Sequence, residues 1–285
     1  MSEFGTLFVI ATPIGNLADI TLRALDTIKA VKVLYAEDTR VTQRLLDHYG
    51  IQAKLQSLHD FNESKKISTI IDHMQSGHDI GLVSDAGTPL ISDPGYKLIA
   101  AVQGVGLTVR PIPGASALTA SLSVAGLPTD RFIFEGFLPK TSNERSKLFT
   151  ALKFEPRTLV FYESPQRIQS SIQLCIKVMG GERKAALLRE LTKYYEQHIC
   201  ASLEVIVKQI EQQQDKIRGE FVFILQGNPA AENAAELNKA TQLLIDLMQY
   251  MPLKQAATIV SKYSGIRRNQ LYSLGLEDNS KNHPE

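Results

Sequence analysis

The sequence is poor in the residues and runs that mark several classes of protein. Its two cysteines, Cys175 and Cys200, lie far apart, with no partner cysteine or histidine at metal-ligand spacing. We therefore expect two buried thiols in a reducing compartment, and neither a disulfide nor a metal site. No apolar run approaches the roughly 20 residues that cross a bilayer. The first residues include an acid and lack the basic region of a signal peptide, so a cytoplasmic protein without a membrane partner is expected.

Charge of one sign is also missing, because the formal net charge is only +1. An anionic partner would have to meet a local basic patch, since no global field attracts it. Hydrophobic residues make up 44% of the 285 residues and charged residues 21%, a balance typical of folded rather than disordered chains. The length predicts about two domains.

The standard signatures of several enzyme classes are absent from the sequence. No GxGxxG follows the first predicted strand and there is no GxxxxGK[ST], which argues against a Rossmann dinucleotide site and a P-loop. There is also no HExxH and no GxSxG nucleophile elbow. We therefore expect chemistry that uses no metal, nicotinamide or covalent nucleophile.

Short apolar runs alternate with amphipathic stretches over most of the chain, which indicates an α/β fold. The first predicted series has strands at 6–11, 31–36, 54–58, 80–84 and 107–112, with helices at 17–30, 40–49, 64–75, one capped by Asp93 and opened by Pro94, and 115–124. The second has strands at 131–138, 157–162, 184–191, 196–200 and 220–225, with helices at 143–153, 166–178 and 203–213. Three helices follow at 233–250, 253–263 and 267–274, and the polar tail from 277 is expected to fray. We expect domains at 1–125 and 126–228 and a helical extension at 229–285.

Polar, glycine-rich and charged clusters follow the predicted strands. In the first series they are residues 12–16, 37–40, 59–63, 85–89 and 113–116. The carboxyl ends of parallel strands share one edge of a sheet, where ligands bind, so we place the active site there and centre it on residues 84–94. Glu37 to Arg40 also reads as an ordinary helix cap with acids in its first turn, and both interpretations stay open.

The second series repeats this pattern with basic side chains after its strands. They are Lys140, Arg167, Arg189 and Lys193. Together they predict a basic mouth for an anionic ligand, although each alone is more typical of a solvated surface charge.

Seven ordered stretches resemble the tetrapyrrole methylase superfamily, in particular its ribosomal RNA small-subunit methyltransferase I branch. They are ATPIGNL (11–17), AEDTR (36–40), SDAGTPLISDPG (84–95), PGASA (113–117), FEGFLP (134–139), FYESP (161–165) and RELTK (189–193). The resemblance implies S-adenosylmethionine bound in a cleft between two α/β domains, and a homodimer. It implies cofactor contacts from Pro13, Gly87, Thr88, Ile91, Ser116, Ala117 and Tyr162.

The same resemblance implies methyl transfer to the ribose 2′-hydroxyl of a cytidine in the decoding region of 16S rRNA in the small ribosomal subunit. A hydroxyl is a poor nucleophile, so a carboxylate from Glu37, Asp38 or Glu163 is expected to accept its proton. The residues expected to contact RNA are Arg40, Lys140, Arg167, Lys193, Arg267 and Arg268. Two other interpretations stay open: a small-molecule methyltransferase of the tetrapyrrole type, and a non-catalytic rRNA-binding assembly protein. The C-terminal helices either bind RNA or only cap the fold.

Overall fold

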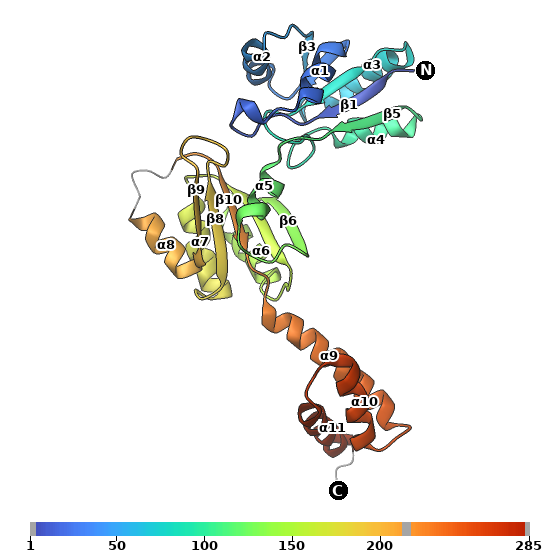
Figure 1. Cartoon of the computed structure of the whole chain (residues 1–285), viewed down its shortest axis with the longest axis vertical. Helices are drawn as coiled ribbons and strands as arrows, with labels where there is room; N and C mark the ends of the chain where they lie inside the picture. The colour runs from blue at the N-terminus through green and yellow to red at the C-terminus, as the bar shows by residue number, and fades with distance from the viewer. Residues whose placement is uncertain (1–3, 213–217, 283–285) are drawn as a thin grey trace. The chain divides into compact units, whose positions relative to one another are not determined.

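Two five-stranded sheets and a set of C-terminal helices make up the computed structural model, which describes residues 4–212 and 218–282 (Figure 1). Contacts divide the chain into two units. The first, Met1–Phe149 with Thr158–Leu225, holds both sheets, and the second is Thr150–Arg157 with Gln226–Glu285. The predicted α/β class is confirmed, and the domain boundaries after residues 125 and 228 stay predictions. Within the described residues, no helix is long and apolar enough to cross a membrane.

The first sheet is entirely parallel, in the order β3-β2-β4-β1-β5. Its strands are β1 (Thr6–Ile10), β2 (Val33–Ala36), β3 (Leu55–Ser57), β4 (Ile80–Val83) and β5 (Thr108–Ile112). Its helical segments are η1 (Leu17–Asp19), α1 (Leu22–Ala30), α2 (Thr39–His48), α3 (Glu63–Gln75), α4 (Tyr96–Gly104) and α5 (Ala117–Val124). Because all five strands run the same way, the loops that follow them meet at one edge, as the sequence predicts.

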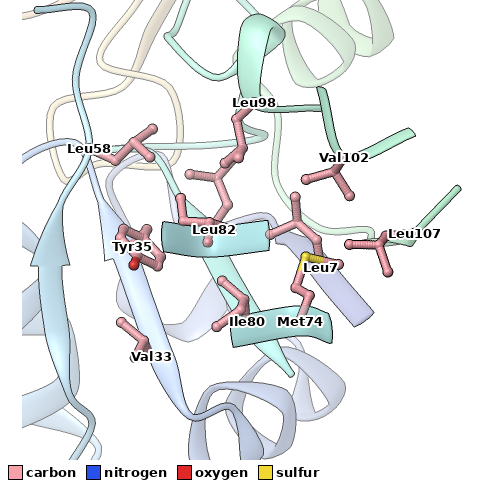
Figure 2. Close-up of a cluster of buried hydrophobic side chains, with 11 residues drawn as sticks. Leu7, Val33, Tyr35, Leu58, Met74, Ile80, Leu82, Leu98, Val102 and Leu107 are labelled. Atoms are coloured by element: carbon pink, nitrogen blue, oxygen red, sulfur yellow. The ribbon is translucent and has the colours of Figure 1, made fainter. Parts of the chain in front are cut away.

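Apolar clusters cover both faces of this sheet. Val33 and Tyr35 of β2 join one cluster with side chains of α3 and α4, and Figure 2 shows that cluster around β4 and β2. Leu34 and Ala36 point the other way and pack with α1 and α2. Central strands that are buried on both faces need apolar residues at nearly every position, which explains the unbroken runs of β1, β2 and β4.

The second sheet is mixed, in the order β6-β7-β10-β8-β9. Its strands are β6 (Phe132–Phe137), β7 (Thr158–Glu163), β8 (Lys184–Arg189), β9 (Gln197–Ser202) and β10 (Phe221–Leu225); its helices are α6 (Ser142–Ala151), α7 (Ile168–Met179) and α8 (Leu203–Glu211). Only β6 and β7 pair in parallel, and the other three pairings are antiparallel. Since β10 lies antiparallel between β7 and β8, the strands β6, β7 and β8 point the same way. Their ends therefore meet at one edge, together with the start of β10.

The C-terminal helices pack around a small apolar core of their own. They are α9 (Pro229–Met248), α10 (Leu253–Ser264) and α11 (Arg268–Asn282). The core residues are Ala240, Leu244, Ala256, Ala257, Val260 and Leu271. Gly265, with φ of 71°, ends α10 in the left-handed conformation that favours glycine. The three predicted helices are confirmed, but the fraying expected from residue 277 is wrong as far as Asn282; residues 283–285 lie outside the described residues.

Two helix starts differ from the sequence prediction. The helix expected at 17–30 is broken, because Ile20 and Thr21 are extended and the Thr21 hydroxyl accepts a hydrogen bond from the Ala24 amide to cap α1. Asp93 does not cap a helix: α4 starts at Tyr96, with Gly95 as its N-cap at φ 125°. The left-handed backbone of Ser92, at φ 71°, turns the chain and leaves Asp93 outside the helix.

The expected burial of both cysteines is half right. Cys175 is fully buried in α7, and burial raises the pKa of its thiol to about 12. Cys200 is exposed on β9, an edge strand of the second sheet, with its thiol directed at the Ala125 carbonyl oxygen 3.2 Å away.

Candidate active site

A cavity of about 490 Å³ lies where the strand ends of the two sheets meet within the first unit. Its volume falls in the range of roughly 300–1,000 Å³ typical of small-molecule sites. The residues lining it from the first sheet are Ile14, Glu37, Asp85, Ala86, Gly87, Thr88, Ile91, Ser92, Asp93, Ser116 and Ala117. Those from the second are Phe137, Tyr162, Glu163, Ser164, Pro165, Leu191, Glu220, Phe221 and Val222. The loop 84–94, predicted as the centre of the site, supplies the largest single part of the wall.

One wall of the cavity is held by backbone pairing between two loops. The Thr12 amide donates to the Gly87 carbonyl at 2.9 Å, and the Gly87 amide donates to the Thr12 carbonyl at 3.1 Å. A methyl group added at Gly87, whose φ is 80°, would lie 3.1 Å from the Ile14 side chain. Thr88 fixes the neighbouring loop by donating its hydroxyl to the Ala115 carbonyl at 3.1 Å. The loops after β1, β4 and β5 therefore form one rigid shelf.

Every non-glycine residue with a left-handed backbone in the described chain lies in the cavity wall or beside it. Leu90 and Ser92 have φ of 73° and 71°, and Glu190 and Thr192, which flank the lining residue Leu191, have φ of 52° and 65°. Such a conformation costs on the order of 1–3 kcal/mol per residue and is typically retained at functional sites. The two strained loops, one from each sheet, support this cavity as the candidate functional site.

The cavity is acidic. The carboxylates that line it belong to Glu37, Asp85, Asp93, Glu163 and Glu220, and the lining residues, all of them in the described part of the chain, include no lysine or arginine. Burial raises the pKa of Glu37, and the nearby charges of Asp85 and Asp93 raise it further. Burial likewise raises the pKa of Asp93, with a further rise from Asp85. An arrangement that keeps carboxylates close together and partly buried favours a cationic ligand and a proton acceptor.

Tyr162 connects the acidic side of the cavity to its aromatic side. Burial raises the pKa of its hydroxyl to about 12, with a further contribution from Asp93, so it stays protonated and can donate a hydrogen bond. Its ring makes edge contacts with Phe134 and Phe137, with centroids 4.9 and 5.4 Å away.

Two of the three predicted proton acceptors have other partners. Glu163 accepts hydrogen bonds from Arg167, from the Ser164 amide and from the Ser171 hydroxyl, and its side chain is fully buried. Asp38 caps α2: it accepts from the Arg40 amide and pairs with the Arg40 guanidinium, which lowers its pKa to about 2. Glu37 is the candidate that lies in the cavity with a raised pKa.

The predicted basic mouth is not an open cluster of cations. Of its four cations, Lys140 is exposed, Arg167 pairs with Glu163, and Arg189 donates to the Arg218 carbonyl and to the Gln197 side-chain oxygen. Arg40, predicted separately as an RNA contact, pairs with Asp38 on the surface, with its side chain 85% exposed. The Lys193 ammonium lies 2.9 Å from Glu190 and 3.1 Å from Glu220. Its methylene stem packs so closely on Gly15 that an added methyl group there would overlap it. Lys193 thereby joins the loop after β8, which supplies the lining residue Leu191, to the loop after β1, which supplies Ile14.

The cavity wall includes all the expected cofactor contacts except Pro13, which is buried between the bridged Thr12 and the lining Ile14. Sequence reasoning missed Asp85, Asp93, Glu220 and Phe137. The sequence predicts Asp93 as a helix cap, and it places Asp85 in the loop 84–94 without a role of its own. Glu220 directly precedes β10 instead of following a strand, and only the antiparallel placement of β10 brings it to this edge.

Comparison with known proteins identifies the family. The family described as Tetrapyrrole (Corrin/Porphyrin) Methylases matches residues 6–206, and the RsmI C-terminal HTH domain matches residues 233–279. Ribosomal RNA small subunit methyltransferase I of Escherichia coli O157:H7 is 44% identical over 96% of this chain and 95% of its own length. The chain belongs to this family of methyltransferases. The protein of the same name from Pseudomonas aeruginosa is 45% identical over 97% of this chain and 99% of its own length.

Two solved structures share the fold of this chain. Uroporphyrin-III-C-methyltransferase from Thermus thermophilus superposes with a TM-score of 0.55 at 16% identity, over 78% of this chain and 94% of that one. Diphthine synthase gives a TM-score of 0.59 at 16% identity, over 78% and 90%. At this identity the likeness supports the two-sheet architecture and says nothing about the substrate. The predicted fold type is confirmed.

Proposed function

We propose that this chain transfers a methyl group from S-adenosylmethionine to the ribose 2′-hydroxyl of a cytidine in 16S rRNA, in the cytoplasm. The observation that carries the proposal is the acidic, backbone-walled cavity, in a chain whose relatives at 44–45% identity are named ribosomal RNA small subunit methyltransferase I. The decoding region is the proposed location of the cytidine, and a homodimer is the proposed assembly.

The cavity fits the cofactor in charge and in wall chemistry. S-Adenosylmethionine carries a sulfonium and an ammonium, and the wall presents carboxylates to such cations. Ser116, the N-cap of α5, makes no capping hydrogen bond with its side chain, so its hydroxyl is available to a ligand. Gly87, Thr88, Ile91, Ser116, Ala117 and Tyr162 are the lining residues that would hold the cofactor, with Pro13 behind them. When bound, the cofactor supplies a methyl group activated by the sulfonium for transfer to oxygen.

Glu37 is the proposed proton acceptor. It must be ionised to remove the proton of the ribose hydroxyl, and its raised pKa makes it a stronger base than an ordinary glutamate. Tyr162 and residues 85–88 of the shelf would orient the reacting groups. Orientation of this kind contributes the larger part of catalysis in such a displacement. Asp38 and Glu163 would act on structure, the first by capping α2 and the second by fixing the loop after β7.

The helical segment is the proposed RNA-binding element. Residues 233–279, which run from α9 into α11, match the RsmI C-terminal HTH domain, and Arg267 and Arg268 are exposed at the turn where α11 starts. We expect the double change Arg267→Glu and Arg268→Glu to weaken binding to 16S rRNA, because it replaces two cations with anions that repel the phosphates. The slope of log K against log salt is negative, and each lost phosphate contact makes it shallower by about 0.7–0.9. Filter binding at several salt concentrations measures this, with Lys177→Glu and Lys208→Glu as a control of equal charge; equal slopes in the two double variants would contradict it.

Lys193 offers a contrasting expectation. Its ammonium already has two carboxylate partners, so we expect Lys193→Met to leave the salt slope of rRNA binding unchanged. The same change releases Glu190 and loosens the wall at Leu191, so we expect weaker binding of S-adenosylmethionine by a few-fold. Calorimetric titration of the cofactor beside the salt series separates the two effects. A salt slope made shallower by about 0.7–0.9, with unchanged cofactor affinity, would show instead that Lys193 binds a phosphate, as the sequence predicts.

The experiment that tests the function uses methyl-labelled S-adenosylmethionine with naked 16S rRNA and, in parallel, with assembled small subunits. We expect the label in one of the two, and nuclease mapping to place it on the ribose of a single cytidine. Label on a small molecule or a protein instead would contradict the RNA substrate. No transfer to any acceptor would favour a non-catalytic assembly protein.

A further inference from the structure

Phe137 presents an aromatic face to the mouth of the cavity. It is the last residue of β6, it lines the cavity, and its side chain is 61% exposed. The Tyr162 ring supports it edge-on from within, with an interplanar angle of 70°. The Phe137 ring is held in place on one side and open on the other, which core packing does not explain. A planar ligand that rests on the open side would explain it.

The backbone directs Phe137 to this place by a β-bulge. The register of β6 against β7 shifts between Phe134 and Gly136. Gly136 has φ of 69°, and a methyl group added there would lie 3.1 Å from the Ser92 hydroxyl. A bulge re-aims the side chains that follow it, and bulges of this kind occur beside active sites. This one packs against the strained loop of the first sheet, so the position of Phe137 is tied to that of the active-site shelf.

The charge of the cavity limits which part of a nucleic acid can lie on this ring. Asp93 is close enough to Tyr162 to raise the pKa of its hydroxyl. Asp85 and Asp93 raise the pKa of Glu37, and Asp85 also raises that of Asp93. A phosphate brought among these carboxylates would be repelled, because no lysine or arginine lines the cavity in the described residues. A neutral base and its ribose carry no such penalty, and a base stacks on an aromatic face.

We propose that Phe137 is the stacking face for the base of the target nucleotide, which enters the cavity out of its own stack while its phosphates stay outside. The inference rests on the proposed function and adds to it a specificity-determining contact. Enzymes that act on one nucleotide commonly take it out of the stack and hold its base against aromatic side chains. Stacking here would bring the ribose hydroxyl to the acidic wall where Glu37 lies.

The test compares Phe137→Ala, Phe137→Tyr and Phe132→Ala. Phe132 is the matched control, because it starts the same strand, is 41% exposed and does not line the cavity. With the wild-type acceptor at varied concentration and the cofactor saturating, we expect Phe137→Ala to raise KM for the RNA acceptor roughly 5- to 30-fold. Phe137→Tyr, which keeps the ring, and Phe132→Ala should stay within about twofold of wild type. Calorimetry on each variant reports the affinity for S-adenosylmethionine.

The outcomes separate the two proposals. An unchanged KM in Phe137→Ala would overturn the stacking role and leave the methyltransferase function standing. A Phe137→Ala variant that loses cofactor affinity and keeps its KM for RNA would make the ring a cofactor contact instead, and would also overturn the inference. Absence of transfer by the wild-type chain would refute the proposed function and, with it, this inference.

Discussion

Replacing Glu37 by glutamine is expected to lower kcat by roughly 10²- to 10⁴-fold, the contribution typical of a positioned general base. The change keeps the shape of the side chain and removes its negative charge, and with it the ability to accept a proton. Binding of S-adenosylmethionine is expected to weaken no more than a few-fold, because Asp85 and Asp93 still line the same wall. Single-turnover label transfer measures the chemical step, and calorimetry measures the affinity.

The pH profile gives a second readout for Glu37. Its pKa is raised above 4.5 by burial and by Asp85 and Asp93, and only the ionised form accepts a proton. The rate is therefore expected to be low at acid pH and to rise as pH increases through this raised pKa. Asp38→Asn is the matched control on the neighbouring residue, and its kcat and pH profile are expected to stay those of wild type. Asparagine also caps helices, so the change keeps the start of α2. An E37Q variant with the kcat and acid limb of wild type would contradict the assignment.

Replacing Glu163 by alanine is expected to lower the free energy of unfolding by about 3 kcal/mol, the lower end of what breaking a buried ion pair costs. The fully buried carboxylate holds Arg167, the Ser164 amide and the Ser171 hydroxyl, and all three would lose their acceptor. Denaturant unfolding measures the loss. Arg40→Ala, which breaks an exposed pair, is expected to change stability little.

A double variant distinguishes a structural Glu163 from a catalytic one. Adding Arg167→Met to Glu163→Ala removes the unpaired charge, so part of the lost stability is expected to return. If Glu163 is the proton acceptor instead, the single variant would fold as stably as wild type and lose kcat, and Arg167→Met would restore nothing.

The sequence was sufficient for the fold and for the edge at which the site lies. Central strands that are apolar at nearly every position and alternate with helices predict a buried parallel sheet. The polar clusters after β1, β2, β4 and β5 then converge by geometry alone. The loop 84–94 kept its predicted place, because the Thr12–Gly87 bridge and the strained Leu90 and Ser92 fix it there.

The roles of individual charged residues could not be predicted, because they depend on partners far away in the sequence. Lys193 and Glu220 are 27 positions apart and meet only because β10 lies beside β8. Glu37 and Asp38 are neighbours of the same kind, yet one lies in the cavity and the other caps a helix. Phe137 depends on a bulge, which the pattern FEGFLP does not reveal by itself.

Hydrogen exchange followed by mass spectrometry, with and without S-adenosylmethionine, tests most directly whether the acidic cavity is the cofactor site. We expect slower exchange on cofactor addition in residues 84–95, 113–118 and 190–193, the loops that form the shelf and the opposing wall. The C-terminal helices are expected to exchange at the same rate in both samples. Protection confined to other parts of the chain, with cofactor binding confirmed by calorimetry, would contradict the account.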